Sequence, residues 1–473
     1  MRDQNKPNIL WICTDQQRFD TLRSNGNEYI DTPNLDGLLE TGVSFDRTYC
    51  QAPVCTPSRA SFLTGRYPRT TGTTRNGNDY FPDDEILVPH ILSQHGYTCG
   101  LIGKLHLSAA DGRTEVLPKH HGYDMVKWSH GPRDGWGDDN AYQVWLKSQG
   151  KSWDKDYHGE EGGIESRYHQ TTWCANEAID FMETNADRPW LLSINIFDPH
   201  HPFDPPKEYK EKYPAKDMPL PKWRDGELDT KPLVQTDDYE NGGQSGLGPS
   251  CKKLNDLEIR EYVSDYYAMV DQIDKQVGRI IDYLDQSGLR DNTIVIFHSD
   301  HGEMLGDHGQ ILKGGHFYEE LVHVPLIFSC PARLKEKLRS QALVELVDLA
   351  PTILGLAGID IPDRMQGSSL VGILEGKAKP DMHKSSVYCE YYNSLPASHK
   401  GVFATMYFDG RYKLTVFHGQ EIGELYDLET DPNEFDNKWA NPEYQSIKCD
   451  LILANFAQSV ATVDPVPAIV GNF

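Results

Sequence analysis

The stretch Asn8-Ile-Leu-Trp-Ile-Cys-Thr14 decides the fold class, because it is a continuous apolar run with the length of a β-strand. Runs that do not alternate with polar residues are typical of a central parallel strand covered on both faces. The run ends directly at the polar residues Asp15 and Gln16. Three further apolar runs of this kind lie at residues 98–103, 190–197 and 293–298.

Each of these three runs also ends in a polar segment. The segments are Lys104-Leu105-His106, Asp198-Pro199-His200-His201 and Ser299-Asp300-His301. Between residues 255 and 286, apolar side chains recur at spacings of three and four, which predicts one long amphipathic helix. Strands that alternate with helices predict a large, mostly parallel sheet inside an α/β sandwich. Ligands of such sheets bind beyond the carboxyl ends of the strands, where the polar segments lie.

The C-terminal part has a different pattern. Alternating runs at 402–408 and 411–417 flank Asp409-Gly410, a strong signal for a β-hairpin. We therefore predict a catalytic domain at residues 1–370 and a smaller C-terminal subdomain with an antiparallel sheet at residues 371–473. Residues 217–250 are rich in Pro, Gly and Asp, and we expect them to form an irregular surface insertion near the active face.

Composition excludes several classes of protein. The formal net charge of the 473 residues is −25, which disfavours nucleic acid as a partner. No window has the eighteen or more apolar residues of a membrane helix, and the polar N-terminus does not have the layout of a signal peptide. The nine cysteines are scattered, as in a reducing compartment. We expect a cytoplasmic protein, or a periplasmic or secreted one if a leader has been removed.

The segment Cys55 to Arg66, which reads CTPSRASFLTGR, carries the most specific chemistry. Thr56-Pro57 predicts a helix start and Gly65 its end. Cys55 would then lie at a helix N-terminus, where free backbone N–H groups favour an anion. Arg59 follows within the first turn, so its side chain could reach the same place.

This segment resembles the signature of the type I sulfatases, Cys-x-Pro-Ser-Arg followed by Ala-x-x-x-Thr-Gly-Arg. The resemblance implies an alkaline-phosphatase-like fold and a maturase that oxidises Cys55 to formylglycine. In that family one hydroxyl of the hydrated aldehyde attacks sulfur, and the other then expels sulfate, which is covalent catalysis. The resemblance extends over roughly residues 7–328 and, less specifically, over Gly423 to Pro432 near the C-terminus.

The resemblance also implies one divalent metal. It assigns as metal ligands Asp15, Gln16, Cys55, Asp300 and His301. Many family members have aspartate in place of Gln16 and asparagine in place of His301, so this site holds only two formal carboxylates. Oxygen ligands suit Ca²⁺, which we favour, or Mg²⁺, while an imidazole also admits Mn²⁺ or Zn²⁺.

The remaining catalytic residues implied by the resemblance are cations and histidines. Arg59, Lys104 and Lys313 would form a positive pocket for sulfate in an acidic protein. His106 would take a proton from the nucleophile, and His200 would protonate the leaving alkoxide. Weaker candidates for contacts with the organic part of the substrate are Asn76, His201 and His316. We expect His308 either to support the metal ligands from behind or to be structural.

The expected reaction is hydrolysis of an organic sulfate ester, most readily that of a sulfated carbohydrate, although an aryl or small alkyl sulfate is also compatible. One alternative is a phosphonate monoester or phosphodiester hydrolase that uses the same formylglycine and an Asp-Gln…Asp-His metal set; the Lys104-x-His106 pair favours the sulfatase. A second alternative is a protein with an unmodified cysteine that binds a sulfated glycan without hydrolysing it.

Overall fold

The computed structural model of the protein describes residues 6–110, 114–133, 135–136, 139–157, 162–395 and 398–463. Its largest sheet has eight strands in the order β5-β4-β6-β1-β7-β8-β2-β9. Their bounds are β1 Asn8–Thr14, β2 Gly42–Phe45, β4 Thr98–Gly103, β5 Met125–Trp128, β6 Trp190–Ile196, β7 Thr293–Ser299, β8 Leu326–Ser329 and β9 Leu338–Ser340.

The centre of this sheet is parallel, as predicted. Strands β5, β4, β6, β1 and β7 run parallel to their neighbours, whereas β8 is antiparallel to β7 and to β2. The four apolar runs recognised in the sequence are four adjacent strands, β4, β6, β1 and β7. Their polar segments therefore lie together at one edge of the sheet.

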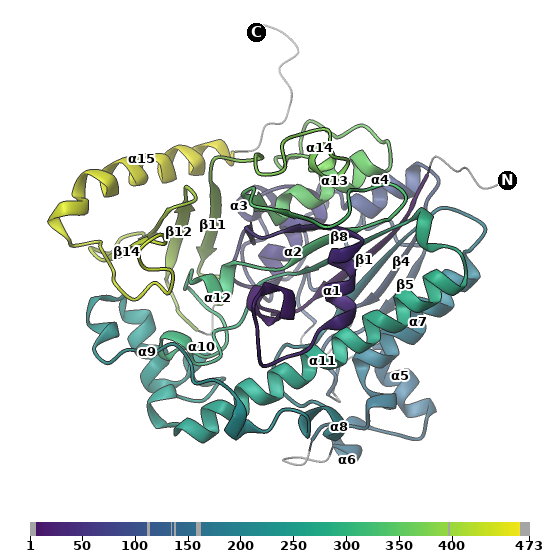
Figure 1. Ribbon diagram of the computed structural model, residues 1–473, viewed down its shortest axis with the longest axis horizontal. Helices are drawn as coiled ribbons and strands as arrows, with labels where there is room; N and C mark the ends of the chain where they lie inside the picture. Colours follow the sequence, from purple (N-terminus) through teal and green to yellow (C-terminus); the bar gives the residue numbers. More distant parts are fainter. Residues whose placement is uncertain are drawn as a thin grey trace, which may run out of the picture.

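Helices cover both faces of the sheet. Their bounds are α1 Pro33–Glu40, α2 Cys55–Thr64, α3 Pro68–Thr71, α4 Val88–Gln94, α5 Ala141–Ser148, α6 Trp153–Asp156, α7 Gln170–Thr184, α8 Lys207–Lys210, α9 Leu233–Asn241, α10 Gly243–Gly246, α11 Asp256–Gln286, α12 Glu319–Val322, α13 Leu349–Leu356, α14 Val371–Leu374 and α15 Gln445–Ala461. In Figure 1, α7 and α11 lie on one side of the sheet, and α2 and α13 lie on the other. Alternate residues of β1 enter the two cores, Trp11 on the α2 side and Ile12 on the α11 side.

The long helix α11 confirms the predicted amphipathic helix, and its Asn255–Glu258 capping box stabilises its N-terminus.

The C-terminal sheet is antiparallel, as predicted, with the strands β11 Val387–Tyr392, β12 Phe403–Phe408, β13 Tyr412–Phe417 and β14 Gly423–Asp427. The predicted hairpin joins β12 to β13, and the Asp409 carboxylate accepts hydrogen bonds from the N–H groups of Arg411 and Tyr412 at 2.8 and 2.7 Å. Side chains of β11 and β12 belong to the same apolar core as α2 and α13. A short parallel pair, β3 Thr48–Tyr49 with β10 Val344–Glu345, lies beside this core.

The expectation of an irregular insertion at 217–250 is wrong in one respect, because the segment contains the helices α9 and α10. Gln235 and Asp238 of α9 are buried and bonded to residues far along the chain. Helix α9 is stabilised by these tertiary contacts and has no periodic apolar face. Its sequence therefore looks like that of a loop.

Among the described residues, no helix combines the length and apolarity that a membrane span requires.

Candidate active site

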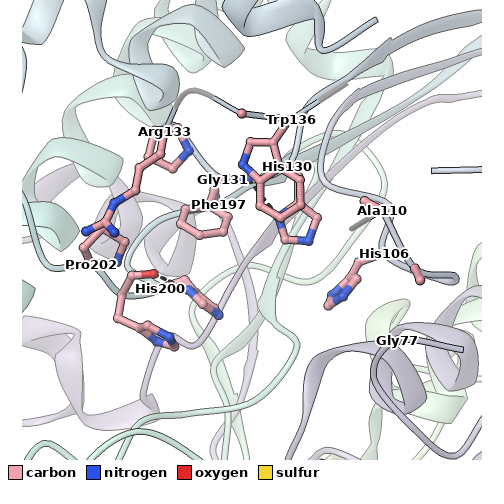
Figure 2. A pocket seen from close by; sticks show the side chains of 14 residues that line it. Gly77, His106, Ala110, His130, Gly131, Arg133, Trp136, Phe197, His200 and Pro202 are labelled. Carbon is pink, nitrogen blue, oxygen red and sulfur yellow. Dashed lines mark hydrogen bonds between the residues drawn. The ribbon is translucent and has the colours of Figure 1, made fainter. Parts of the chain in front are cut away.

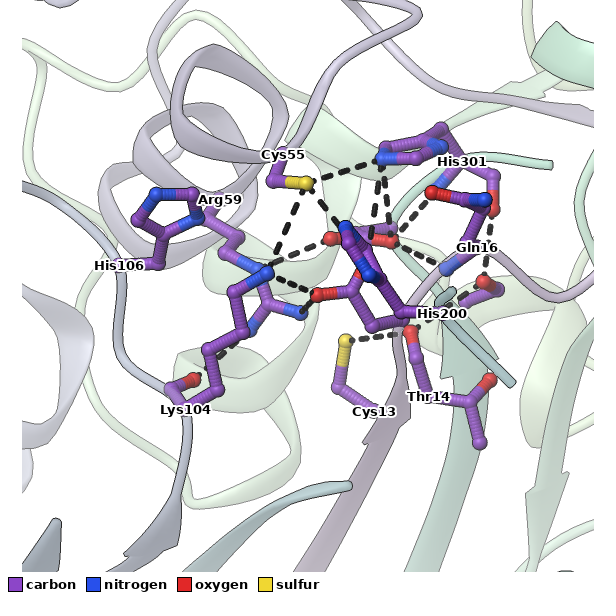
Figure 3. A network of polar contacts seen from close by, with 12 residues as sticks. Cys13, Thr14, Gln16, Cys55, Arg59, Lys104, His106, His200 and His301 are labelled. Atoms are coloured by element: carbon purple, nitrogen blue, oxygen red, sulfur yellow. Dashed lines mark hydrogen bonds and ion pairs between the residues drawn. The ribbon is translucent and has the colours of Figure 1, made fainter. Parts of the chain in front are cut away.

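The polar segments that follow β1, β4, β6 and β7 meet the N-terminus of α2 (Figure 3). Cys55 is the first residue of α2, and its side chain is fully buried. The amide side chain of Asn76 accepts a hydrogen bond from the N–H of Thr56 at 2.9 Å, which satisfies one free donor of the helix. Gly65 ends the helix with φ = 71°, as the sequence predicted.

The thiol of Cys55 is surrounded by cationic and metal-ligating groups. Its Sγ atom lies 2.9 Å from Nζ of Lys313, 3.2 Å from Nε2 of His301 and 3.8 Å from Nζ of Lys104. Burial alone would raise the pKa of Cys55, but the charges of Lys104 and Lys313 outweigh it and hold that pKa well below its ordinary value. The position therefore stabilises negative charge on the atom at the start of α2.

Two carboxylates and an imidazole converge beside this thiol. Nε2 of His301 lies 3.9 Å from Oδ1 of Asp15 and 3.8 Å from Oδ1 of Asp300. Nδ1 of His301 is 2.8 Å from the carbonyl oxygen of Gly302, so it donates its proton there and Nε2 faces the acids with a lone pair. Burial, followed by the nearby charge of Asp15, raises the pKa of Asp300, and His301 and Arg59 offset this only in part. The four potential ligand atoms, Sγ of Cys55 included, lie within 4.8 Å of one another, and this donor set fits a divalent metal.

Gln16 links the acidic cluster to Lys313. Its Oε1 accepts a hydrogen bond from Nζ of Lys313 at 2.8 Å, and its Nε2 donates to the buried carboxylate of Glu303. Sequence reasoning missed Glu303, which orients Gln16 and accepts a further bond from the N–H of Leu305 at 3.1 Å. Glu303 follows the predicted ligand His301 by two residues, and this closeness in sequence could have indicated that it belongs to the site.

Arg59 lies beneath the cluster and is fully buried. Its guanidinium donates to Asp300 at 2.9 Å, to Asp15 at 3.2 Å and to the carbonyl oxygen of Lys104 at 2.8 Å. Burial opposes its charge, but Asp300 and the other nearby acids raise the pKa of Arg59, so it remains a cation. Arg59 therefore holds the two acids in place, and no hydrogen bond joins its guanidinium to Cys55 among the described residues.

His106 and His200 both approach Cys55. The thiol of Cys55 acts to raise the pKa of each imidazole, but other influences are larger. Burial, reinforced by Lys104 for His106 and by Lys313 for His200, lowers the pKa of each to about 4, so both rings are neutral at neutral pH. The carboxylate of Glu115 accepts hydrogen bonds from the N–H of His106 at 2.7 Å and that of Ser108 at 3.1 Å, which fixes the loop carrying His106.

The weaker candidates lie in different surroundings. Asn76 caps α2, as described above, and His308 is buried, bonded to Glu227 and stacked on Tyr318. His201 lines a cleft outside the catalytic cluster, stacked on His200 with 4.0 Å between ring centroids. His316 is buried behind Lys313 and lines neither of the two clefts described below.

His316, Asp238 and His399 form a second buried cluster of potential metal ligands. The Nε2 atoms of His316 and His399 lie 3.0 and 2.7 Å from the same carboxylate oxygen of Asp238. Nδ1 of His399 accepts the N–H of Gly315 at 3.1 Å, so Nε2 must carry the proton and donates it to Asp238. His399 therefore connects Asp238 of α9 to the backbone next to Lys313, and we call this hydrogen-bonded cluster the relay.

The catalytic cluster opens into a cleft of about 610 Å³ (Figure 2). His106 and His200 lie at its inner end, and His130, Trp136 and Phe197 form its aromatic wall. His130 stacks on Trp136 with 4.2 Å between centroids and contacts His106 edge-on at 4.8 Å. Sequence reasoning missed His130, Arg133 and Trp136, because they follow none of the four strands on which the site prediction rested.

Comparisons with known proteins agree with this geometry. A family model described as sulfatase matches residues 7–359, and a model of the C-terminal part of N-sulphoglucosamine sulphohydrolase matches residues 306–458. The chain belongs to the sulfatase family, and it is therefore a hydrolase of sulfate esters.

Three relatives illustrate the breadth of this likeness. The chain is 31% identical to an arylsulfatase of Clostridium perfringens, over 93% of this chain and 92% of that protein. It is 27% identical to an N-acetylglucosamine-6-O-sulfatase of Bacteroides thetaiotaomicron, over 94% and 85% of the two chains. Its fold is similar to that of a phosphonate monoester hydrolase of Agrobacterium radiobacter, with a TM-score of 0.84, 25% identity, and coverage of 98% of this chain and 97% of that one.

Proposed function

We propose that the protein removes sulfate from a sulfated carbohydrate, using a formylglycine made from Cys55 by a maturase and one divalent metal, Ca²⁺ by preference. The observation that carries this proposal is the position of Cys55: a buried residue at a helix N-terminus, 2.9 Å from Lys313 and beside the Asp15–Asp300–His301 cluster. The thiol occupies the place of the formylglycine hydroxyls, so its neighbours are the groups that would contact those oxygens.

The mature residue would act as a hydrated aldehyde. One hydroxyl oxygen bonds to sulfur as the bond from sulfur to the leaving alcohol breaks, and the second hydroxyl then restores the aldehyde and releases sulfate. His106 and His200, which flank this atom, would carry the protons to and from the nucleophile and the leaving oxygen. Lys104 and Lys313 would bind the sulfate oxygens and stabilise the charge that develops on them.

The proposed metal site consists of Asp15, Gln16, Asp300 and His301 together with the mature residue 55. A cation bound there would polarise the sulfate oxygens. Arg59 and Glu303 would hold the ligands rather than touch the substrate, since Arg59 bonds both acids and Glu303 bonds the amide of Gln16. The preference for Ca²⁺ rests on the oxygen-rich donor set.

A sulfated carbohydrate is favoured by the size of the cleft and by the relatives. The cleft of about 610 Å³ is larger than a small alkyl sulfate needs, and its aromatic wall suits the faces of sugar rings. One relative is named as a sulfatase of N-acetylglucosamine and another, from Formosa agariphila, as active on ulvan.

The second candidate function is hydrolysis of phosphonate monoesters or phosphodiesters by the same site. One observation favours it: the Asp15-Gln16 and Asp300-His301 pairs match the Asp-Gln…Asp-His pattern associated with such enzymes. The fold likeness to a phosphonate monoester hydrolase is compatible with both functions.

One experiment separates these functions. The chain would be co-expressed with a formylglycine-generating enzyme, and the mass of the peptide containing Cys55 would be measured. Hydrolysis of a chromogenic aryl sulfate and of an aryl phosphonate monoester would then be compared after metal removal and after addition of Ca²⁺, Mg²⁺ or Mn²⁺. An aldehyde mass with preferential sulfate release supports the sulfatase, whereas preferential phosphonate cleavage supports the alternative. An unmodified cysteine despite a competent maturase contradicts the proposed nucleophile.

A further inference from the structure

A second cleft, of about 470 Å³, adjoins the first, and Figure 2 labels Arg133 and Pro202, which line both. Arg133, His201 and Pro202 line both clefts, so they form the junction between the two. The second cleft is lined further by Phe203, Tyr262, Glu261 and Asp265. Aromatic rings next to carboxylates are suited to a sugar unit, because the ring packs on the apolar face of the sugar and the carboxylates accept bonds from its hydroxyls.

The guanidinium of Arg133, at the junction, is free to bind a ligand. Arg133 is exposed and forms no ion pair and donates no hydrogen bond within the described part of the chain. The neighbouring carboxyl of Asp204 is buried, and its Oδ2 has no hydrogen-bond partner among the described residues. Burial raises the pKa of Asp204 well above its usual range, although Arg133 lowers it, so this acid does not balance the charge of Arg133.

The charges around the junction restrict where a second anion can bind. The protein carries a net charge of −25, and the far wall of the second cleft carries Glu261 and Asp265. Lys210 pairs with Asp265 at 3.0 Å, whereas Glu261 is exposed. Lys104 and Lys313 already face Cys55, so they are committed to the sulfate that is removed. Of the described residues that line both clefts, Arg133 is the one with a permanent positive charge, and it is available for a second acidic group.

We infer that the substrate is an acidic oligosaccharide: the first cleft holds the sugar that bears the scissile sulfate, the second cleft holds the adjoining sugar, and Arg133 binds a further carboxylate or sulfate where the two sugars join. This inference rests on the proposed sulfatase function and specifies its substrate class. Arg133 is then a specificity residue that distinguishes acidic oligosaccharides from simple sulfate esters.

The test compares substrates that differ in one feature. The mature wild-type enzyme is assayed on an aryl sulfate, a monosulfated monosaccharide, a monosulfated disaccharide with a uronate carboxylate, and the same disaccharide with that carboxylate reduced to an alcohol. A disulfated disaccharide replaces the carboxylate by a second sulfate and thus separates the two sources of the anion. We expect kcat/KM to be at least about tenfold higher for an acidic disaccharide than for its reduced form or for the monosaccharide.

The variants are Arg133→Ala, Arg133→Lys and, as a control for the loss of one exposed positive charge, Arg188→Ala. Arg188 is exposed and pairs only with its neighbour Asp187 in the described structure. In Arg133→Ala, the ratio of kcat/KM for the acidic disaccharide to kcat/KM for the aryl sulfate should fall at least about tenfold, mainly through KM, with partial recovery in Arg133→Lys. The Arg188→Ala ratio should equal that of the wild type.

The outcomes also separate this inference from the proposed function. If the wild type hydrolyses sulfate esters but its ratio falls less than tenfold in Arg133→Ala, the inference is overturned and the sulfatase function stands. Equal kcat/KM for the acidic and reduced disaccharides overturns it as well. If no sulfate ester is hydrolysed by formylglycine-containing enzyme, the proposed function itself fails.

Discussion

At the scale of single residues, the site concentrates charge around one atom. Sγ of Cys55 has two lysine ammonium groups within 4 Å, and potential ligand atoms of Asp15 and Asp300 lie within 4.8 Å of it. This arrangement can stabilise negative charge on an oxygen atom next to a cation. A buried cysteine with a purely structural role does not require so many charged neighbours. The other cysteines illustrate the difference, since all nine are unpaired, eight are buried, and burial raises the pKa of Cys13 and Cys174.

The first prediction concerns the nucleophile. Cys55→Ala should abolish hydrolysis of sulfate esters, because no aldehyde can form, while the thermal unfolding midpoint stays within a few degrees of the wild type. Cys55→Ser should also be inactive unless the host has a maturase that oxidises serine. Circular dichroism and a chromogenic sulfate assay provide the two measurements. Full activity of purified Cys55→Ala would contradict the mechanism.

The second prediction concerns the two lysines. Lys104→Ala and Lys313→Ala should each lower kcat/KM at least about tenfold, which corresponds to roughly 1.4 kcal/mol of transition-state stabilisation. The two losses should be similar, because each lysine also holds a proposed metal ligand: Lys104 pairs with Asp15, and Lys313 donates to Gln16. Lys212→Ala, at an exposed lysine paired with Asp271, is the matched control. A lysine whose removal leaves the rate unchanged does not bind the sulfate.

At the scale of elements, strands and helices deliver these residues to one edge of the sheet. The sequence was sufficient to predict this because the four central strands are apolar throughout and each ends in polar residues. It was also sufficient for α2, whose start at Cys55 and end at Gly65 follow from capping preferences. Helix α9 was not predictable in this way, since Gln235 and Asp238 find their partners on Tyr318 and His399, which are distant in sequence. The cleft residues His130 and Arg133 were missed because they follow β5, an edge strand of the sheet that the site prediction did not include.

The third prediction tests how the relay supports the loop of Lys313. A Cβ atom added to Gly314 would lie 2.1 Å from Cε1 of His399, so Gly314→Ala must displace His399 and break its bond to Gly315. We expect kcat to fall several-fold as Lys313 loses its position, while the protein remains folded. Gly37→Ala is the control, since a Cβ there meets nothing within 4 Å and alanine favours the helix. An unchanged kcat in Gly314→Ala would show that the relay does not position Lys313.

At the scale of the whole molecule, the C-terminal sheet contributes to the active site through the segment that follows Lys313. Lys413 of β13 binds the carboxylates of Glu319 at 2.9 Å and Glu434 at 2.6 Å, and Glu434 accepts the N–H of Glu319 at 2.8 Å. His399, which also lies in the C-terminal part, bonds Gly315 on the other side of the same segment. The predicted division at residue 370 stays a prediction, but the two parts share one apolar core and jointly fix this segment. Removal of the C-terminal part should therefore destroy activity as well as stability.

Glu390, on the strand β11 of this shared core, supports a prediction about pH. One of its carboxylate oxygens accepts the N–H of Arg69 at 2.7 Å, while the other has no partner among the described residues. Burial raises the pKa of Glu390 to about 7, against about 4.5 in the unfolded chain. A carboxyl with a raised pKa binds its proton more tightly in the folded state, so its contribution is complete below pH 4.5 and is lost as the pH rises to 7. Between pH 5 and pH 8 this one group should reduce the free energy of unfolding by roughly 2–3 kcal/mol.

Glu390→Gln tests this contribution, since glutamine keeps the shape of the protonated acid but does not titrate. Urea unfolding at pH 5 and pH 8 should show a decrease in the free energy of unfolding that is smaller in Glu390→Gln than in the wild type by roughly 2–3 kcal/mol. The control is Glu443→Gln, at an exposed position on the surface, where the decrease should equal that of the wild type. Because Glu390 joins β11 to the N-terminus of α3, a reduced pH dependence in Glu390→Gln would place a contact that weakens as the pH rises between the C-terminal sheet and the catalytic core. An equal decrease in both variants would mean that Glu390 ionises in the folded protein as readily as in water.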